Sequence, residues 1–169
     1  MTTGARVSKE PLGPWSADEP ESKASWVSGW FSEEQGGATC PTGQAIYRVE
    51  CNGRYCDNLR IFCSDSGDTA LGASTYWTPF FSEEQGGGGC ATGYAATGIW
   101  CNGSFCDNIA LECTAVDYNV VDDCSWTPWF SEENNGHGSM PAQYYRMTYM
   151  SCSGRYCDNK RMFGCDYDN

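Results

Sequence analysis

The chain has 169 residues, 12 of them cysteine, and its 10 basic and 22 acidic side chains give a formal net charge of −12. An acidic body repels phosphate backbones, anionic membranes and sulfated glycans, so these partners are not expected. No apolar run reaches 18 residues, which also argues against membrane insertion. Neutral partners and cations remain as candidates.

Residues 1–24 are rich in Ser, Glu and Lys and contain Pro11, Pro14 and Pro20. This composition predicts a flexible tail or linker. The segment does not read as a signal peptide, because no apolar run follows a basic start. The cysteine content nevertheless favours a secreted protein, either as a free chain or as a module of a larger one.

The rest of the chain, residues 25–169, repeats itself three times with a period of about 50 residues. The copies span about 25–66, 75–116 and 124–168, and each contains a segment that begins Phe-Ser-Glu-Glu. A unit of this size is small for independent stability. We therefore expect a single three-repeat domain, a monomer in which each surface site occurs up to three times.

Within each copy the hydrophobic pattern has a period of two, which is typical of half-buried strands. The clearest segments are Ile46–Glu50, Leu59–Cys63, Ala110–Cys113 and Tyr144–Met150. Asn52-Gly53 and its counterparts Asn102-Gly103 and Ser153-Gly154 predict tight turns between paired strands. Glycine runs such as Gly86–Gly89 break helices, and no helical pattern is found. The sequence predicts an all-β, disulfide-rich fold with pseudo-threefold symmetry.

The cysteines recur at fixed positions, which predicts a disulfide framework and an oxidising compartment. The third copy has Met140 where the first two have Cys40 and Cys90, and it gains Cys124 instead. If each short CxxxxC loop closes on itself, Cys124 is the partner left for Cys165. The predicted pairs are Cys40–Cys63, Cys51–Cys56, Cys90–Cys113, Cys101–Cys106, Cys124–Cys165 and Cys152–Cys157.

Zinc is the alternative use for these cysteines. Structural zinc sites favour CxxC spacing or histidine ligands. The only histidine, His137, lies between glycines and is expected in a solvated loop. We therefore predict no metal among the cysteines.

The first candidate site is an aromatic pair followed by two carboxylates. An aromatic ring stacks on the apolar C–H face of a pyranose, and carboxylates accept hydrogen bonds from sugar hydroxyls. The candidate sugar contacts are Trp30, Glu33, Glu34, Phe80, Glu83, Glu84, Trp129, Glu132 and Glu133, with Trp26, Trp77 and Trp126 nearby.

Packing in the core is the alternative role for these rings. Because strand neighbours face opposite ways, Phe31, Phe81 and Phe130 are expected inside and the preceding aromatic residue outside. Exposed aromatic residues repeated three times indicate ligand binding. Adjacent glutamates such as Glu33 and Glu34 would not flank one glycosidic bond, so catalysis is not expected.

The second candidate site is the loop between the paired strands, where an aromatic residue precedes Cys-Asp-Asn. Its aromatic members are Tyr55, Phe105 and Tyr156, which are further candidate sugar contacts. Asp57 and Asn58 suit sugar hydroxyls or a calcium ion, but Asp and Asn also bond their own backbone in turns, and we favour that role. No cofactor is predicted, because the motif supplies few of the oxygen ligands that calcium needs.

The repeat resembles the vitelline membrane outer layer protein I family. The matching segments are Cys40-Pro41-Thr42-Gly43, Cys90 to Ile99 with its A-x-G-hydrophobic strand, and Asn58 to Cys63 with its N-x-R-hydrophobic-x-C strand. Ser139-Met140-Pro141-Ala142 departs from the C-P-x-G pattern. The resemblance covers most of residues 25–166 and implies a β-prism, three sheets around a pseudo-threefold axis. A β-trefoil is the alternative, since its repeats have a similar length.

The Ser-Glu-Glu-Gln-Gly and C-x-G-x-Y-C-D-N segments are similar to those of multivalent carbohydrate-binding modules such as family 92, which bind β-glucans. That resemblance implies sugar contacts at Trp30, Trp129 and the neighbouring glutamates, with Phe80 as a departure that weakens the second site. The sequence therefore predicts a secreted lectin or carbohydrate-binding module for a neutral polysaccharide such as a β-glucan. The alternatives are a structural matrix or barrier protein and a glycoside hydrolase.

Overall fold

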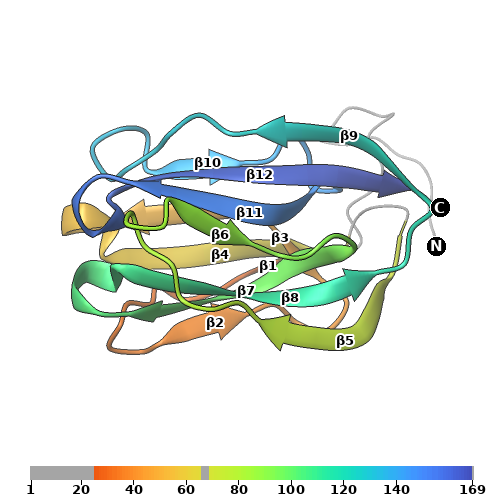
Figure 1. Ribbon diagram of the computed structural model, residues 1–169, viewed down its shortest axis with the longest axis horizontal. Helices are drawn as coiled ribbons and strands as arrows, with labels where there is room; N and C mark the ends of the chain where they lie inside the picture. The colour runs from red at the N-terminus through yellow and green to blue at the C-terminus, as the bar shows by residue number, and fades with distance from the viewer. Residues whose placement is uncertain (1–24, 66–68, 169) are drawn as a thin grey trace.

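The computed structural model describes residues 25–65 and 69–168 (Figure 1). The predicted tail, residues 1–24, lies outside the described residues. The described elements are twelve strands and three short 3₁₀ turns, which confirms the all-β prediction. None of these turns is long or apolar enough to cross a bilayer.

The strands form three antiparallel sheets of four. The first sheet has the order β1 (Ser25–Val27), β4 (Asn58–Ser64), β3 (Ala45–Asn52) and β10 (His137–Ser139). The second has β2 (Gly37–Thr39), β7 (Tyr94–Asn102), β8 (Asn108–Val116) and β5 (Leu71–Trp77). The third has β6 (Gly87–Gly89), β11 (Arg146–Ser153), β12 (Asn159–Asp168) and β9 (Val120–Trp126).

Each sheet borrows one edge strand from another repeat. β2 of the first repeat pairs with β7, β6 of the second pairs with β11, and β10 of the third pairs with β3, so the exchange closes a ring. The prediction that His137 lies in a solvated loop is wrong, because it begins β10 and stands opposite Glu50. The exchange makes the three repeats one body.

The exchanged strands are glycine-rich because they cross directly over aromatic rings. A Cβ at Gly88 would overlap the ring of Phe81, and one at Gly138 would overlap the ring of Phe130. The glycines that break helices in the sequence therefore form strands here. Their lack of a side chain is what allows one repeat to reach the next.

The core runs along the shared axis of the three sheets. Phe31, Phe81 and Phe130 are buried as predicted, with exposed fractions of 3%, 3% and 1%. Each forms an isolated bridge with one residue of the central hairpin, and these partners are Leu59, Ile109 and Lys160. Three four-stranded sheets around one core is the prism arrangement, and the β-trefoil alternative is set aside.

All six predicted disulfides are present. They join Cys40–Cys63, Cys51–Cys56, Cys90–Cys113, Cys101–Cys106, Cys124–Cys165 and Cys152–Cys157. No cysteine is free. Since a zinc site needs thiolates, the zinc alternative has no ligands left.

The hairpin tips differ from the predicted tight turns. Asn52 still pairs with Asn58, but five residues lie between them and include a 3₁₀ turn, η1 (Arg54–Cys56). Gly53 has φ 78°, as a turn glycine should, but Tyr55 and Cys56 are also left-handed, at φ 61° and 57°. The short disulfide at each tip fits this longer loop, and η2 (Ser104–Cys106) and η3 (Arg155–Cys157) repeat it.

Candidate functional site

Large aromatic side chains are exposed on the outer faces of the sheets. Trp30, Phe80 and Trp129 are 39%, 44% and 37% exposed, so the aromatic residue before each core Phe does face outward, as predicted. Trp77 and Trp126 are exposed as well. We call the exposed aromatic residues of each sheet its platform. The first platform contains Trp30, the second contains Phe80 and Trp77, and the third contains Trp129 and Trp126.

Trp26 does not belong to these platforms. It stands opposite Cys63 in β4 and packs against the core, whereas Val27 stands opposite Phe62. Trp77 and Trp126 occupy the position of Val27, opposite Glu112 and Phe163. The first repeat has one more residue between Trp26 and Phe31 than the other repeats have, so the three tryptophans are not equivalent.

The sequence predictions missed Trp100. It lies in β7 between the buried residues Ile99 and Cys101 and is 43% exposed on the second platform. Its ring meets the ring of Trp77 edge to face, with centroids 6.1 Å apart. The alternation of Ile99, Trp100 and Cys101 in the sequence is the signal that would have identified it.

The first platform combines Trp30 with charged residues. The guanidinium of Arg60 lies 4.5 Å from the centroid of the Trp30 ring and also faces Phe62. Arg60 forms a 2.7 Å ion pair with Glu50, which also pairs with Arg48. An open groove of about 430 Å³ lined by Tyr47, Glu50 and Phe62, among others, adjoins it. Aromatic faces and paired polar groups therefore lie together on this face.

The second platform has hydroxyls in place of the arginines. The Thr97 hydroxyl donates to Glu112 at 2.8 Å and lies 2.8 Å from the hydroxyl of Thr114. These three side chains line a second groove that also reaches Thr39 and Thr75. None of the described residues that line this groove is basic, so this face offers hydroxyl and carboxylate groups instead of a cation.

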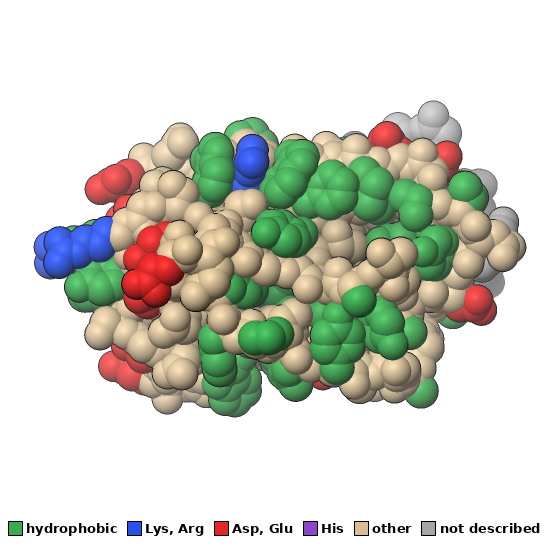
Figure 2. All heavy atoms as spheres, in the orientation of Figure 1, with side chains coloured by type: hydrophobic (Ala, Val, Ile, Leu, Met, Phe, Trp, Pro, Cys, Tyr) green, Lys and Arg blue, Asp and Glu red, His purple; other side chains and the backbone are tan. Residues whose placement is uncertain are grey.

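The third platform is the most aromatic. The guanidinium of Arg161 stacks against the rings of Trp126 and Trp129, at 4.3 Å and 4.7 Å from their centroids. Phe163 and Tyr149 pack against Trp126 at 5.0 Å and 6.0 Å. Figure 2 shows hydrophobic side chains gathered along this side of the molecule, over β9 and β12, with a basic side chain among them.

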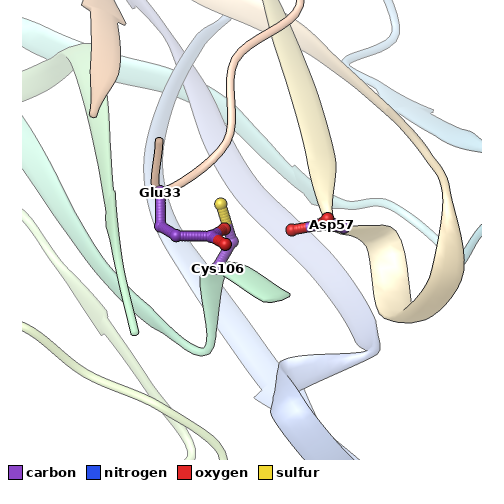
Figure 3. Close-up of side chains that lie close together, drawn as sticks. All are labelled: Glu33, Asp57 and Cys106. Carbon is purple, nitrogen blue, oxygen red and sulfur yellow. The ribbon is translucent and has the colours of Figure 1, made fainter. Parts of the chain in front are cut away.

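In the first and third copies, the first glutamate of the Ser-Glu-Glu segment lies at the contact between repeats. Oxygen atoms of Glu33 and Asp57 lie within 4.8 Å of each other and of the sulfur of Cys106 in the next repeat (Figure 3). Glu132 and Asp158 take the same place beside Cys56, and Oε2 of Glu132 accepts a 3.2 Å hydrogen bond from the Tyr55 N–H. Left-handed tip residues thus present N–H groups to a neighbouring carboxylate.

The other residues of that segment shape its turn. The Ser32 N–H and hydroxyl both donate to Oε1 of Gln35, at 2.9 Å and 3.1 Å, and the Cys101 N–H of the next repeat donates to the Gly36 carbonyl at 2.5 Å. Glu34, Glu84 and Glu133 are the exposed glutamates. The motif therefore stabilises the contact between repeats, which we call the joint, and its second glutamate stays on the surface.

Burial, together with the facing glutamate, changes the acidity of the aspartates at this joint. The pKa of Asp57 rises to about 6, first because burial disfavours its charge and then because Glu33 lies opposite. The same causes raise the pKa of Asp107 and of Asp158 to about 6. Burial opposes ionisation of Glu132, but hydrogen bonds from Asp158 and from the Tyr55 and Cys56 N–H groups outweigh it and lower its pKa.

The tip aromatics meet one another on the axis. The rings of Tyr55, Phe105 and Tyr156 form a closed triad with centroids 4.9–5.0 Å apart. Arg54 and Arg155 stack on the two tyrosine rings. The three aromatic residues at the tips, which were candidate sugar contacts, therefore bury much of their ring surface against each other. Together they close one end of the core.

The acidic groups supply few ligands for a metal. The clusters around Asp57 and Asp158 each contain two carboxylates and one cysteine sulfur, but these sulfurs are in disulfides and offer no thiolate. Calcium takes six to eight oxygen ligands as a rule. A third group, Asp122, Asp166 and Asp168, brings together three carboxylates near the end of the chain.

We expect the three joint aspartates to make stability depend on pH. A carboxyl with a raised pKa contributes stability that is complete below its unfolded pKa, here 3.8, and is lost as pH rises through its folded pKa of about 6. The melting temperature should therefore be a few degrees higher at about pH 5 than at about pH 7.5. Lys160, whose pKa burial lowers to about 8, acts mainly above this window.

The matched control is the triple variant Asp57→Asn, Asp107→Asn and Asp158→Asn, which should melt at nearly the same temperature at both pH values. Thermal unfolding of the oxidised protein measures both. A wild-type melting temperature that rises between the two pH values would contradict this account of the joint.

Comparison of the chain with protein-family models, with curated proteins and with solved structures returned no match.

Proposed function

We propose that the chain is a non-catalytic carbohydrate-binding protein, a lectin or carbohydrate-binding module, that binds a neutral polysaccharide such as a β-glucan on its outer faces. The observation that carries the proposal is the exposed tryptophan on every sheet: Trp30 on the first, Trp77 and Trp100 on the second, Trp126 and Trp129 on the third. Burying a large apolar ring is favourable. Rings left outside on all three faces favour a ligand that covers them.

Sugars fit the chemistry of these faces. The C–H face of a pyranose stacks on an aromatic ring, and its hydroxyls pair with polar groups at the ring edge. Glu50 and Arg48 supply such groups on the first platform, and Thr114 and Glu112 supply them on the second. Three platforms on one rigid body add avidity for a repeating polymer without strong individual sites.

The three platforms differ in composition, so their affinities should differ. The second has Phe80 where the others have tryptophan, and Ala110 where they have Arg60 and Arg161. Phenylalanine has the smaller stacking surface. We therefore expect the second platform to bind neutral sugar through Trp77 and Trp100 rather than through Phe80.

Catalysis is not part of the proposal. Glu33 and Glu132 each lie beside the aspartate of their own repeat and a disulfide of the next repeat, and their neighbours Glu34 and Glu133 are exposed on the surface. A glycosidase places its two carboxylates on opposite sides of one bond. The joint carboxylates instead have a structural partner, the hairpin tip of the adjacent repeat.

An oxidising, extracellular location belongs to the proposal. Six disulfides suit a secreted protein. We further propose that the protein acts as a monomer and needs no cofactor. A structural role of the vitelline outer layer type is the second candidate, and the feature that favours it is the closed ring of exchanged strands with its six cross-links.

Isothermal titration of the oxidised protein with gluco- and galacto-oligosaccharides, with and without calcium, tests the proposal. A heat signal with more than one site per chain is expected for a short neutral oligosaccharide. Trp30→Ala should remove one site and leave the melting temperature nearly unchanged. Val27→Ala is the matched control, because Val27 is an exposed, non-aromatic residue beside the same platform.

Three outcomes would overturn the proposal. No binding to any neutral sugar would remove the lectin function and favour the structural role. A marked loss of stability in Trp30→Ala would show that this ring belongs to the packing. Hydrolysis of the oligosaccharide during the titration would instead point to a glycoside hydrolase.

A further inference from the structure

One pair of opposed positions differs among the three sheets in a way that changes the charge of each platform. In the central hairpins, Glu50 stands opposite Arg60, Trp100 opposite Ala110, and Ser151 opposite Arg161. The first pair is a cation with a counterion, the second is apolar, and the third is a cation opposite a neutral side chain. The three platforms are thus three versions of one site that differ in charge, and they can be compared within one protein.

On the first platform two arginines, Arg48 and Arg60, share one counterion, Glu50. Nε of Arg60 donates to Oε1 of Glu50 at 2.8 Å, and Arg48 donates to Oε2 of the same carboxylate at 2.6 Å. Both oxygens of Glu50 are therefore engaged, and Arg60 has a counterion while it stacks on Trp30. An acidic ligand would have to compete with Glu50 for these groups.

On the third platform the basic charge has no such partner. Arg161 forms no ion pair with any residue in the described part of the chain, and its Nε is buried without a hydrogen-bond partner there. The rings of Trp126 and Trp129 flank its guanidinium and remove water from its faces. A cation that is partly desolvated and short of acceptors gains most from a carboxylate, which guanidinium binds in a bidentate manner.

The surroundings of Arg161 define what carries that carboxylate. Trp126 and Trp129 are 43% and 37% exposed, and Phe163 and Tyr149 extend the aromatic surface beside them. Rings next to a guanidinium suit a pyranose that bears an acidic group. Serine at position 151 and arginine at 161 therefore form, with the two indoles, a site with one charge and a stacking surface.

We propose that the third platform binds a uronic acid residue of a polysaccharide, with the carboxylate on Arg161 and the ring against Trp126 or Trp129. The other two platforms bind neutral residues. This inference rests on the proposed function, because it assigns the charge of the sugar that one platform takes. The net charge of −12 opposes a densely charged polymer, so the site suits a sparsely charged glycan in which acidic residues are set among neutral ones.

The test uses three probes: xylotriose bearing a single glucuronic acid, its methyl ester, which differs from the acid only at the carboxyl group, and unsubstituted xylotriose, which lacks the glucuronic acid residue. Isothermal titration of the wild-type protein should show one site for the free acid, bound about tenfold or more tightly than the ester. Higher salt should weaken that difference. A Gly-Glu-Gly peptide with an acetylated N-terminus and an amidated C-terminus carries the same single charge without a sugar and should bind far more weakly than the acid.

Matched variants locate the site. Arg161→Ala should abolish the preference for the acid over the ester, and the fold tolerates alanine at this position in the second repeat, where Ala110 stands. Arg60→Ala removes an equivalent arginine that already has a counterion, so it should leave the preference intact. Ser151→Glu places the counterion of the first platform on the third and should abolish the preference as well.

Several results would overturn the inference. Equal affinity for the acid and the ester would do so without any variant, as would equal losses in Arg60→Ala and Arg161→Ala, or a peptide bound as tightly as the sugar. Titration of the same protein with the neutral gluco-oligosaccharides that test the proposed function separates this failure from failure of the proposed function. If neutral sugars bind and the protein binds the ester as tightly as the acid, only the assignment of an acidic sugar to the third platform is wrong.

Discussion

Replacing Phe130 by Ala is expected to lower the free energy of unfolding by about 3–5 kcal/mol, the largest loss that we expect from a single side chain. Phe130 is 1% exposed, and its backbone bonds to Lys160 in both directions at 2.8 Å and 2.9 Å. Its ring also lies under Gly138 of the exchanged strand β10. Removing the ring leaves a cavity where two repeats meet.

The neighbouring residue provides the control for this prediction. Trp129→Ala removes a larger ring, but one that is exposed on the third platform, so the expected loss is about 1 kcal/mol or less from its contact with Arg161. Denaturant unfolding of the oxidised variants measures both. If Trp129→Ala costs as much as Phe130→Ala, the tryptophan belongs to the packing and the platform interpretation fails.

Replacing Lys160 by Leu is expected to stabilise the protein by roughly 1–3 kcal/mol at neutral pH, because each unit by which burial depresses the pKa of this lysine costs about 1.4 kcal/mol while the lysine is charged. Lys160 is fully buried at the position that Leu59 and Ile109 occupy in the other repeats. Its ammonium donates a 2.6 Å hydrogen bond to the Cys157 carbonyl. Burial nevertheless lowers the pKa of Lys160 to about 8. The desolvation cost of the ammonium therefore outweighs its attraction to Asp158, Glu132 and Asp107.

The pH dependence gives this prediction a second readout. A lysine whose pKa is depressed in the folded state destabilises it when charged, so wild-type stability should rise between about pH 7 and pH 10 as Lys160 loses its proton. The Leu variant should lack that rise. Lys160→Met, an unbranched side chain, should behave like Leu. Destabilised Leu and Met variants would show instead that the charge is needed to balance the acidic joint.

Much of the site was predictable because it depends on local alternation. Each core phenylalanine directly follows an exposed aromatic residue on an extended segment. Neighbours on such a segment face opposite ways, so Phe130 faces the core and Trp129 faces outward. The same rule would have found Trp100. It misplaced Trp26, because a single extra residue before Phe31 moves that tryptophan to the other face of β1.

The roles of the repeated polar residues were less predictable. Glu33 and Glu132 were candidates for sugar contact, but their carboxyl groups lie at tips of other repeats, beside Cys106 and Cys56. Nothing local in Ser-Glu-Glu-Gln-Gly shows which repeat it touches. The free charge of Arg161 likewise depends on its partner across the hairpin, Ser151, and not on its neighbours in sequence.

The sequence by itself determined the all-β class, the threefold repetition and all six disulfide pairs, because period-two alternation, recurring segments and the displaced cysteine of the third copy are visible in one chain. Only the tertiary structure decided that β2, β6 and β10 cross to another sheet, and hence which carboxylates, tips and glycines meet. Strand pairing is a contact between distant segments, and three nearly identical repeats offer each edge strand three nearly identical partners. Packing around the shared axis selects among them.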